Sequence, residues 1–182
     1  MASRQFVLPP ATKKKSRMSS STAISTFLRL RPTKAAGHFS EPVGASEGGT
    51  SQIEVHVPDE EKSGFINNKR TNWRFAFNGI IEQSASQDEV FEQVGKPVVD
   101  SVMEGFNGTI FAYGQTGSGK TFTLTGGVSA YAERGIIPRT LSEVFRAIEL
   151  ASSEAEHTVR ISYLEIYNEG GFDLLDPRQG AA

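Results

Sequence analysis

The sequence contains no cysteine and no long apolar run. Without cysteine there is no disulfide framework, no thiolate nucleophile and no metal site with cysteine ligands. The apolar runs are only a few residues long, whereas a helix needs roughly 20 apolar residues to cross a bilayer. The basic N-terminus also lacks the apolar segment of a secretory signal. We therefore expect no contact with a membrane and predict a cytoplasmic location.

Acidic side chains are absent from residues 1–40, which carry eight basic ones. The other 142 residues carry 11 basic and 21 acidic side chains, a net charge of −10. The basic run over residues 13–17 is compatible with nuclear import or polyanion binding. Its Pro-, Ser- and Thr-rich surroundings favour a solvated, disordered tail instead. We predict such a tail over residues 1–23, no nucleic-acid partner, and one folded domain over residues 24–182.

Alternating apolar and polar residues predict strands over residues 24–31, 53–57 and 73–77, and Asn78-Gly79 predicts a turn after the third. The apolar run over residues 109–113 has the composition of a buried strand. Residues 158–167, rich in β-branched and aromatic side chains, predict a further strand.

Two segments have helical periodicity. In residues 87–106 the apolar residues recur at helical spacing: Val90, Phe91, Val94, Val98, Val102 and Phe106. Pro97 predicts a kink there, or two helical pieces. A second helix is expected over residues 138–151, starting at Pro138 or slightly later if Thr140 and Glu143 form a capping box. Strands separated by helices predict an α/β fold. The sequence has no heptad repeat, so we expect no coiled coil for dimerisation in it.

One motif carries recognisable chemistry. The run Gly114-Gln115-Thr116-Gly117-Ser118-Gly119-Lys120-Thr121 matches the phosphate-binding pattern G-x-x-x-x-G-K-[ST] at every fixed position. Its glycines let the backbone N–H groups converge on phosphate oxygens, and a following helix adds its positive end. Lys120 is expected to reach the β- and γ-phosphates, and the Thr121 hydroxyl to ligate Mg²⁺.

Other readings of the polar residues are weaker. A glycine-rich surface turn with an incidental lysine would also contain the motif. His38, His56 and His157 are scattered, so they do not predict a metal site. Glu165 after an apolar strand resembles an acidic metal ligand, although strand packing explains its position equally well.

The residues around the motif are similar to the kinesin motor domain. The string NGTIFAYGQTGSGKTFT over residues 107–123 is far more specific than the phosphate motif alone. Further matches occur in the right order at residues 28–32, 135–139, 162–169 and 173–176. Within kinesins, residues 64–70, 125–127 and 168–173 resemble the ninth class, which serves cilia and flagella.

The resemblance implies an incomplete P-loop NTPase sheet with flanking helices, ATP and Mg²⁺ as ligands, and microtubules (tubulin) as partner. By position, Arg29, Arg31 and Pro32 match the adenine-side residues of the family. Phe122 matches the residue that flanks the base from the other side. A cytoskeletal location, in a cilium or flagellum, is also implied.

The two switch strings of the kinesin family, of Ser-Ser-Arg-Ser-His and Asp-Leu-Ala-Gly-Ser-Glu type, do not occur in this sequence. We therefore predict that residues 24–182 form the N-terminal half of a motor domain and assign no catalytic residue. The family is a microtubule-stimulated ATPase, but this chain alone is expected not to turn over ATP. A strand over residues 109–113 would lack its usual neighbours, so a marginally stable chain is expected.

Three alternatives stay open. The first is a non-catalytic nucleotide-binding or regulatory fragment. The second is an interaction protein that acts through its basic tail, and the third is another class of P-loop NTPase.

Overall fold

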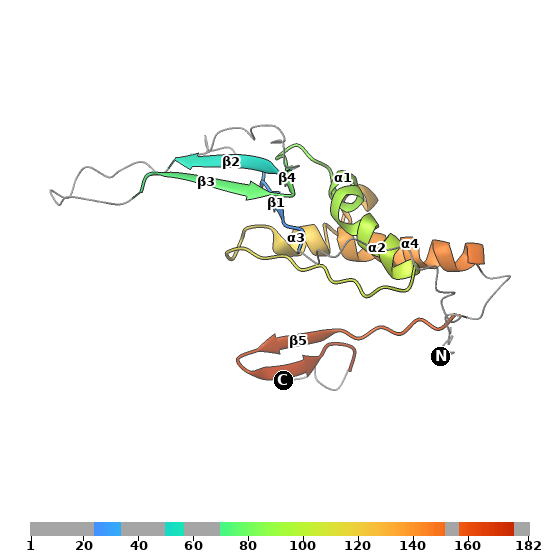
Figure 1. The fold of residues 1–182 in the computed structure, drawn as a ribbon. Helices are drawn as coiled ribbons and strands as arrows, with labels where there is room; N and C mark the ends of the chain where they lie inside the picture. The colour runs from blue at the N-terminus through green and yellow to red at the C-terminus, as the bar shows by residue number, and fades with distance from the viewer. Residues whose placement is uncertain (1–23, 34–49, 57–69, 152–156, 177–182) are drawn as a thin grey trace. The chain divides into compact units, whose positions relative to one another are not determined.

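The computed structural model describes residues 24–33, 50–56, 70–151 and 157–176 (Figure 1). They fall into two compact units, whose boundary lies between Val144 and Phe145 inside helix α4 (Ile136–Ala151). The predicted tail over residues 1–23 lies outside the described residues. Among those that are described, no helix is both long enough and apolar enough to cross a membrane.

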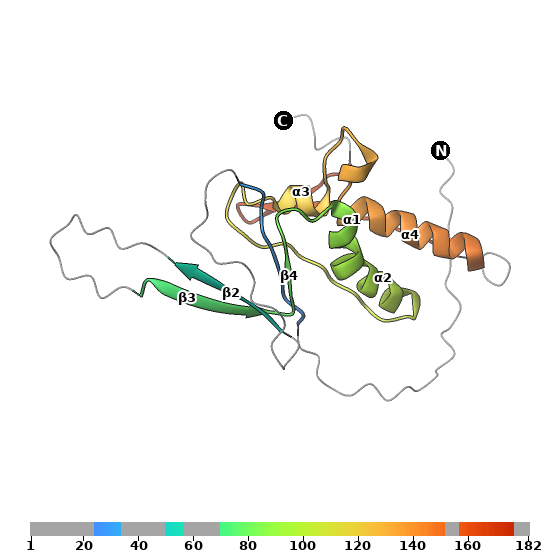
Figure 2. The same ribbon diagram turned by 90° about the horizontal axis from the view of Figure 1, so that it is seen from above.

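The larger unit contains two pairs of strands. β1 (Phe27–Arg29) is parallel to β4 (Gly79–Ile81), and β2 (Ser51–His56) is antiparallel to β3 (Asn72–Phe77). Figure 2 shows β4 between the β2–β3 pair and helices α1 and α2. The strands predicted over residues 53–57 and 73–77 are confirmed, apart from Val57, which lies outside the described residues. The strand predicted over residues 24–31 is confirmed only over its three central residues, Phe27–Arg29.

The predicted break near Pro97 is present as a change of helix type. α1 (Gln87–Val90) continues into a π-helical turn (Phe91–Gly95) and then into α2 (Lys96–Met103). Because proline has no N–H, it cannot donate to the carbonyl one turn back, and the ladder widens before it. The Lys96 N–H accordingly donates to the carbonyl of Phe91, five residues earlier.

This extra residue in the turn rotates the apolar face of α2. The predicted face continued from Val94 to Val98, but the buried residue is Val99, with Met103 partly buried one turn later. The added residue carries the face from Val94 to Val99 in place of Val98. Phe106, also predicted on this face, lies beyond the end of α2 and is 52% exposed.

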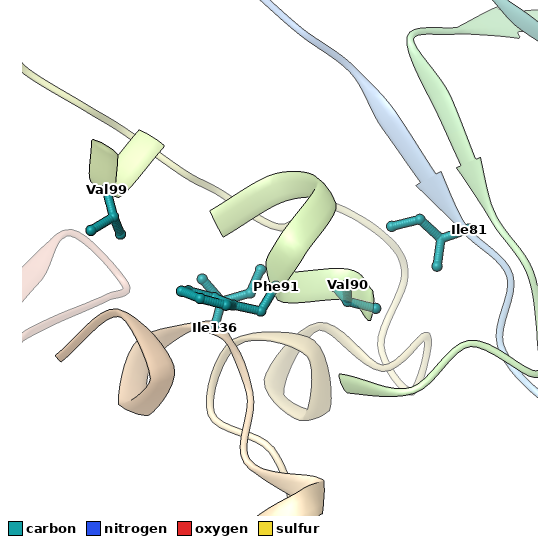
Figure 3. Packing of buried hydrophobic residues seen from close by; sticks show 5 residues of the cluster. All are labelled: Ile81, Val90, Phe91, Val99 and Ile136. Atoms are coloured by element: carbon teal, nitrogen blue, oxygen red, sulfur yellow. The ribbon is translucent and has the colours of Figure 1, made fainter. Parts of the chain in front are cut away.

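A small apolar core holds these elements together. Five buried side chains form it: Ile81, Val90, Phe91, Val99 and Ile136 (Figure 3). They come from β4, α1, the π-helical turn, α2 and the start of α4, so residues far apart in the sequence meet here. Burial of such side chains contributes about 1.5–3 kcal/mol each.

Residues 109–113 form no strand in the structure, so this prediction is wrong. Among the described residues no strand pairs with this segment. Only Ile110 packs against the core, whereas Phe111 and Tyr113 are 71% and 95% exposed. An apolar run becomes a buried strand only where neighbours satisfy its backbone N–H and C=O groups.

α4 begins at Ile136, two residues before the predicted start, so Pro138 lies in its first turn. Proline is tolerated there because the first N–H groups of a helix have no partner within it. The alternative start with a capping box at Thr140 is therefore wrong. Arg139 in the same turn donates to Asp88 (Nη1 to Oδ1, 2.6 Å), which links α4 to α1.

The described part of the smaller unit holds one hairpin. β5 (Leu164–Tyr167) pairs with β6 (Gly170–Asp173), and Asn168 and Glu169 form its two-residue turn with φ of 47° and 64°. The strand predicted over residues 158–167 is confirmed only over its last four residues. The described residues thus contain both helices and strands, as the α/β prediction requires. Their strands form three two-stranded sheets.

Candidate nucleotide site

The phosphate motif forms a tight loop between the irregular segment 106–114 and the five-residue helix α3 (Lys120–Leu124). The Ser118 N–H donates to the carbonyl of Gln115 (3.1 Å), which closes a turn. Gly117 and Gly119 have φ of 80° and 101°. Gly119 caps α3 in this left-handed conformation, which only glycine adopts without strain. Gln115 and Thr116 are exposed.

Lys120 folds back over the loop. Its ammonium donates to the carbonyls of Gly114 and Gln115, both at 2.9 Å. An ammonium group has three N–H donors, so one is left for a further acceptor after these two bonds. The expected helix after the loop is present but short, and its dipole sums few peptide units. Positive charge at this loop therefore comes from side chains such as Lys120 more than from the helix, which fits a phosphate ligand.

The end of β1 reaches the same loop. Arg31, two residues after β1, donates through Nη1 to the carbonyl of Gly117 at 2.5 Å. Pro32 follows it and is exposed, and the Thr33 N–H donates to Gln83 Oε1 at 3.0 Å. The structure thus places Arg31 in contact with the phosphate loop itself.

Arg29, in β1, contacts helix α3. Its guanidinium carbon lies 5.5 Å from the centre of the Phe122 ring, and its Nη1 donates to the Thr123 hydroxyl at 2.9 Å. Burial lowers the pKa of Arg29 below its ordinary value, but a guanidinium stays charged in proteins. Phe122 is 45% exposed, so part of its ring surface is open to a ligand.

Sequence reasoning missed Gln87, which connects these groups. Its Oε1 accepts from Arg29 Nη1 at 2.9 Å, and its Nε2 donates to the carbonyl of Phe122 at 2.7 Å. Gln87 is three residues before Val90 and four before Phe91, in phase with the apolar face of the helix. A polar side chain on a buried face needs partners, and this signal was present in the sequence.

The turn after α3 supplies the last partner of Gln87. Its Nε2 also donates to the carbonyl of Glu133 at 3.0 Å. The loop returns to this point because Gly126 forms a bridge with Arg134 at a φ of 86°. A Cβ atom on Gly126 would collide with the backbone around Glu133, so the close approach requires glycine.

The predicted metal ligand, Thr121, is exposed in the first turn of α3. Over the described ranges, no three His, Asp or Glu side chains gather closely enough to hold a metal ion. Of the predicted site residues, the structure therefore brings together the loop, Arg29, Arg31 and Phe122.

A family model described as the kinesin motor domain matches residues 29–182. The chain belongs to the kinesin motor family. The Kinesin-like protein KIF9 of Mus musculus is 47% identical over 152 residues, which cover 84% of this chain and 19% of that protein. The Kinesin-like protein KLP1 of Chlamydomonas reinhardtii is 43% identical over 161 residues, 88% of this chain and 20% of that protein. The chain thus spans about a fifth of the length of these kinesins.

The chain is also similar to solved kinesin structures. The structure of a fast kinesin, described with implications for ATPase mechanism and interactions with microtubules, is 32% identical to this chain and superposes with a TM-score of 0.70. The match covers 86% of this chain and 42% of that one. The predicted family and P-loop NTPase fold are confirmed, and KIF9 and KLP1 agree with the predicted likeness to the ninth kinesin class.

Proposed function

We propose that this chain provides the ATP-binding portion of a microtubule-based kinesin motor. One observation carries the proposal: the Lys120 ammonium and Arg31 bond the phosphate loop, and Arg29 contacts the short helix that follows this loop. In a phosphate-binding loop these groups have distinct tasks, and each can be assigned to a residue.

In this proposal the loop Gly114–Thr121 holds the triphosphate. Backbone N–H groups of the loop bind phosphate oxygens, and the third N–H of Lys120 binds an oxygen of the β- or γ-phosphate. Arg31 stabilises the conformation of the loop, because its guanidinium donates to the carbonyl of Gly117. The Thr121 hydroxyl is the proposed protein ligand for Mg²⁺, whose other ligands would be phosphate oxygens and water.

The adenine would lie beside Arg29, Pro32 and Phe122. Phe122 offers exposed ring surface, and Pro32 is exposed at the far end of the β1 segment. Aromatic and apolar faces on two sides make a suitable slot for a purine ring. The Arg29 guanidinium over Phe122 adds a planar, charged group next to it.

We further propose that the chain binds nucleotide without turning it over on its own. Phosphoryl transfer depends on groups that surround the γ-phosphate and orient the attacking water. The kinesin switch strings that do this do not occur in these 182 residues. We assign residues 24–182 to the N-terminal half of a motor domain, in line with the 42% coverage of a solved kinesin. The competing function is a non-catalytic nucleotide-binding module.

The test is calorimetric binding of Mg·ATP to the full chain, with circular dichroism on the same sample. We expect Lys120→Ala to weaken binding roughly 10- to 100-fold, because a charge-assisted bond to phosphate is lost. The matched control is Lys96→Ala, since Lys96 lies in α2 and pairs with Asp100 at 2.9 Å. The control should bind like the wild type.

A folded wild-type chain that does not bind Mg·ATP would contradict the proposal, as would equal affinity in the Lys120→Ala chain. Steady hydrolysis by the wild-type chain alone would contradict the second claim, that it binds without turnover.

By family, we propose microtubules as the partner and the cytoskeleton as the location, with a cilium or flagellum indicated by the likeness to the ninth class. The protein carrying a fluorescent tag should co-localise with axonemal microtubules. Uniform staining of the cytosol would contradict this assignment.

A further inference from the structure

Gln87 is the most deeply buried polar side chain of the nucleotide-site region, with 5% of its surface exposed. It occupies the first position of α1, where Val90 and Phe91 on the same face are core residues. An uncharged amide in such a place is costly unless its oxygen and nitrogen are both bonded. We therefore expect the bonds of Gln87 to hold specific partner residues in place.

The side-chain amide is fully used. Oε1 accepts from Arg29, and Nε2 donates to the carbonyls of Phe122 and Glu133 at 2.7 and 3.0 Å. These partners come from β1, α3 and the turn that follows α3. One side chain of α1 thus fixes both members of the pair in which the Arg29 guanidinium covers Phe122.

None of these bonds reaches the phosphate loop. Lys120 is held by Gly114 and Gln115, and Gly117 is held by Arg31. Gln87 touches neither set. A connection does run through the Thr123 hydroxyl, which accepts from Arg29 and donates to the carbonyl of Gly119 at 3.0 Å. Gln87 therefore bonds the residues proposed for the base directly and reaches the phosphate loop only through Arg29 and Thr123.

We propose that Gln87 is a positioning residue for the base half of the nucleotide site. It holds the Arg29 guanidinium against the Phe122 ring and makes no bond of its own to the phosphate loop, so its loss weakens binding of the base far more than binding of the phosphates. This inference rests on the proposed function. A purely structural role, joining α1 to α3, would instead disturb both halves, because the phosphate loop leads directly into α3.

The experiment compares two ligands on the full chain: Mg·ATP, and Mg·tripolyphosphate, which has no base. Gln87→Met keeps the length of the side chain and removes all three bonds. We expect its affinity for Mg·ATP to fall about tenfold and its affinity for Mg·tripolyphosphate to stay within twofold of wild type. The matched control is Gln93→Met, because Gln93 is exposed in the π-helical turn and away from the buried face that carries Gln87; both affinities should be unchanged.

A double-mutant cycle tests whether Gln87 acts through Arg29. In an Arg29→Met background, Gln87→Met should cost less than twofold further in Mg·ATP affinity, since coupled residues are not additive. A second tenfold loss in that background would overturn the route through Arg29.

The outcomes separate the inference from the proposed function. If the wild type binds neither ligand, the proposed function fails and the inference fails with it. If the wild type binds both and Gln87→Met weakens both equally, only the inference fails. If Gln87→Met does not fold, Arg29→Met decides, because it removes the guanidinium that Gln87 holds: a loss of Mg·ATP affinity with Mg·tripolyphosphate affinity within twofold of wild type supports the inference, and an equal loss of both overturns it.

Discussion

The larger unit, which contains the phosphate loop, and the β5–β6 hairpin of the smaller unit are built in opposite ways. The first has five core side chains, all 5% exposed or less, and a buried amide with three bonds. In the hairpin every residue of β5 is exposed, including Leu164 at 62% and Ile166 at 75%. The hairpin is held by its own backbone ladder and turn.

This difference indicates that the buried core of the larger unit contributes more to the free energy of unfolding than the hairpin does. A two-stranded hairpin without a covered face is marginal in water, whereas burial of apolar side chains is the main stabilising term in folding. We therefore expect the hairpin to open locally at low cost and the core around Phe91 to open only with the larger unit as a whole.

The largest effect is expected from truncation at the core. Phe91→Ala should lower the free energy of unfolding of the larger unit by about 3–5 kcal/mol, since it leaves a cavity among Ile81, Val99 and Ile136. Urea titration followed by the fluorescence of Trp73, the single tryptophan, measures this. The control is Phe172→Ala in β6, 43% exposed, with an expected cost below about 1 kcal/mol. Equal costs would break the comparison between the two regions.

A smaller effect of opposite sign is expected at the hairpin turn. Glu169 has a φ of 64°, which glycine adopts without the roughly 1 kcal/mol that other residues lose. Glu169→Gly should therefore stabilise the hairpin by up to about 1 kcal/mol, seen as slower amide exchange in β5 and β6. Glu165→Gly, within β5, should speed exchange instead. Unchanged or faster exchange in Glu169→Gly would contradict the strain assigned to the turn.

The smallest effect is a pH dependence at the start of α1. Glu89 Oε2 accepts from the Ser86 N–H at 2.7 Å and from its hydroxyl at 2.8 Å, and these bonds lower the pKa of Glu89 below its ordinary 4.5. The stabilisation is therefore present above pH 4.5 and lost as the pH falls through the lowered pKa. An NMR titration of the Glu89 carboxyl group measures the shift. It should become smaller in Ser86→Ala, which removes the hydroxyl bond and keeps the backbone N–H bond, and an unchanged shift there would contradict the part assigned to the hydroxyl.

Local sequence signals predicted much of the larger unit. Alternation located β2 and β3, and Pro97 marked the break between α1 and α2. The identity of the buried residues in α2 could not be read in the same way, because the π-helical turn moved the face from Val98 to Val99. Periodicity assumes one helix geometry throughout, and a single widened turn changes the phase of everything after it.

The candidate site shows the same division. The spacing of Gly114, Gly119, Lys120 and Thr121 identified the phosphate loop without any structure. The role of Gln87 could not be found from spacing, since its partners Arg29 and Phe122 lie 58 and 35 residues away. Only the fold brings such distant polar groups to one buried point.

The sequence by itself determined the kinesin family, the phosphate loop and most element types, because each depends on neighbouring residues or on a contiguous motif. Tertiary structure alone decided that residues 109–113 form no strand, that Val99 rather than Val98 is buried, and that Gln87 joins Arg29 to Phe122. These three outcomes depend on which partners are present in space to satisfy a backbone group, an apolar surface or a buried amide. No local pattern records that information.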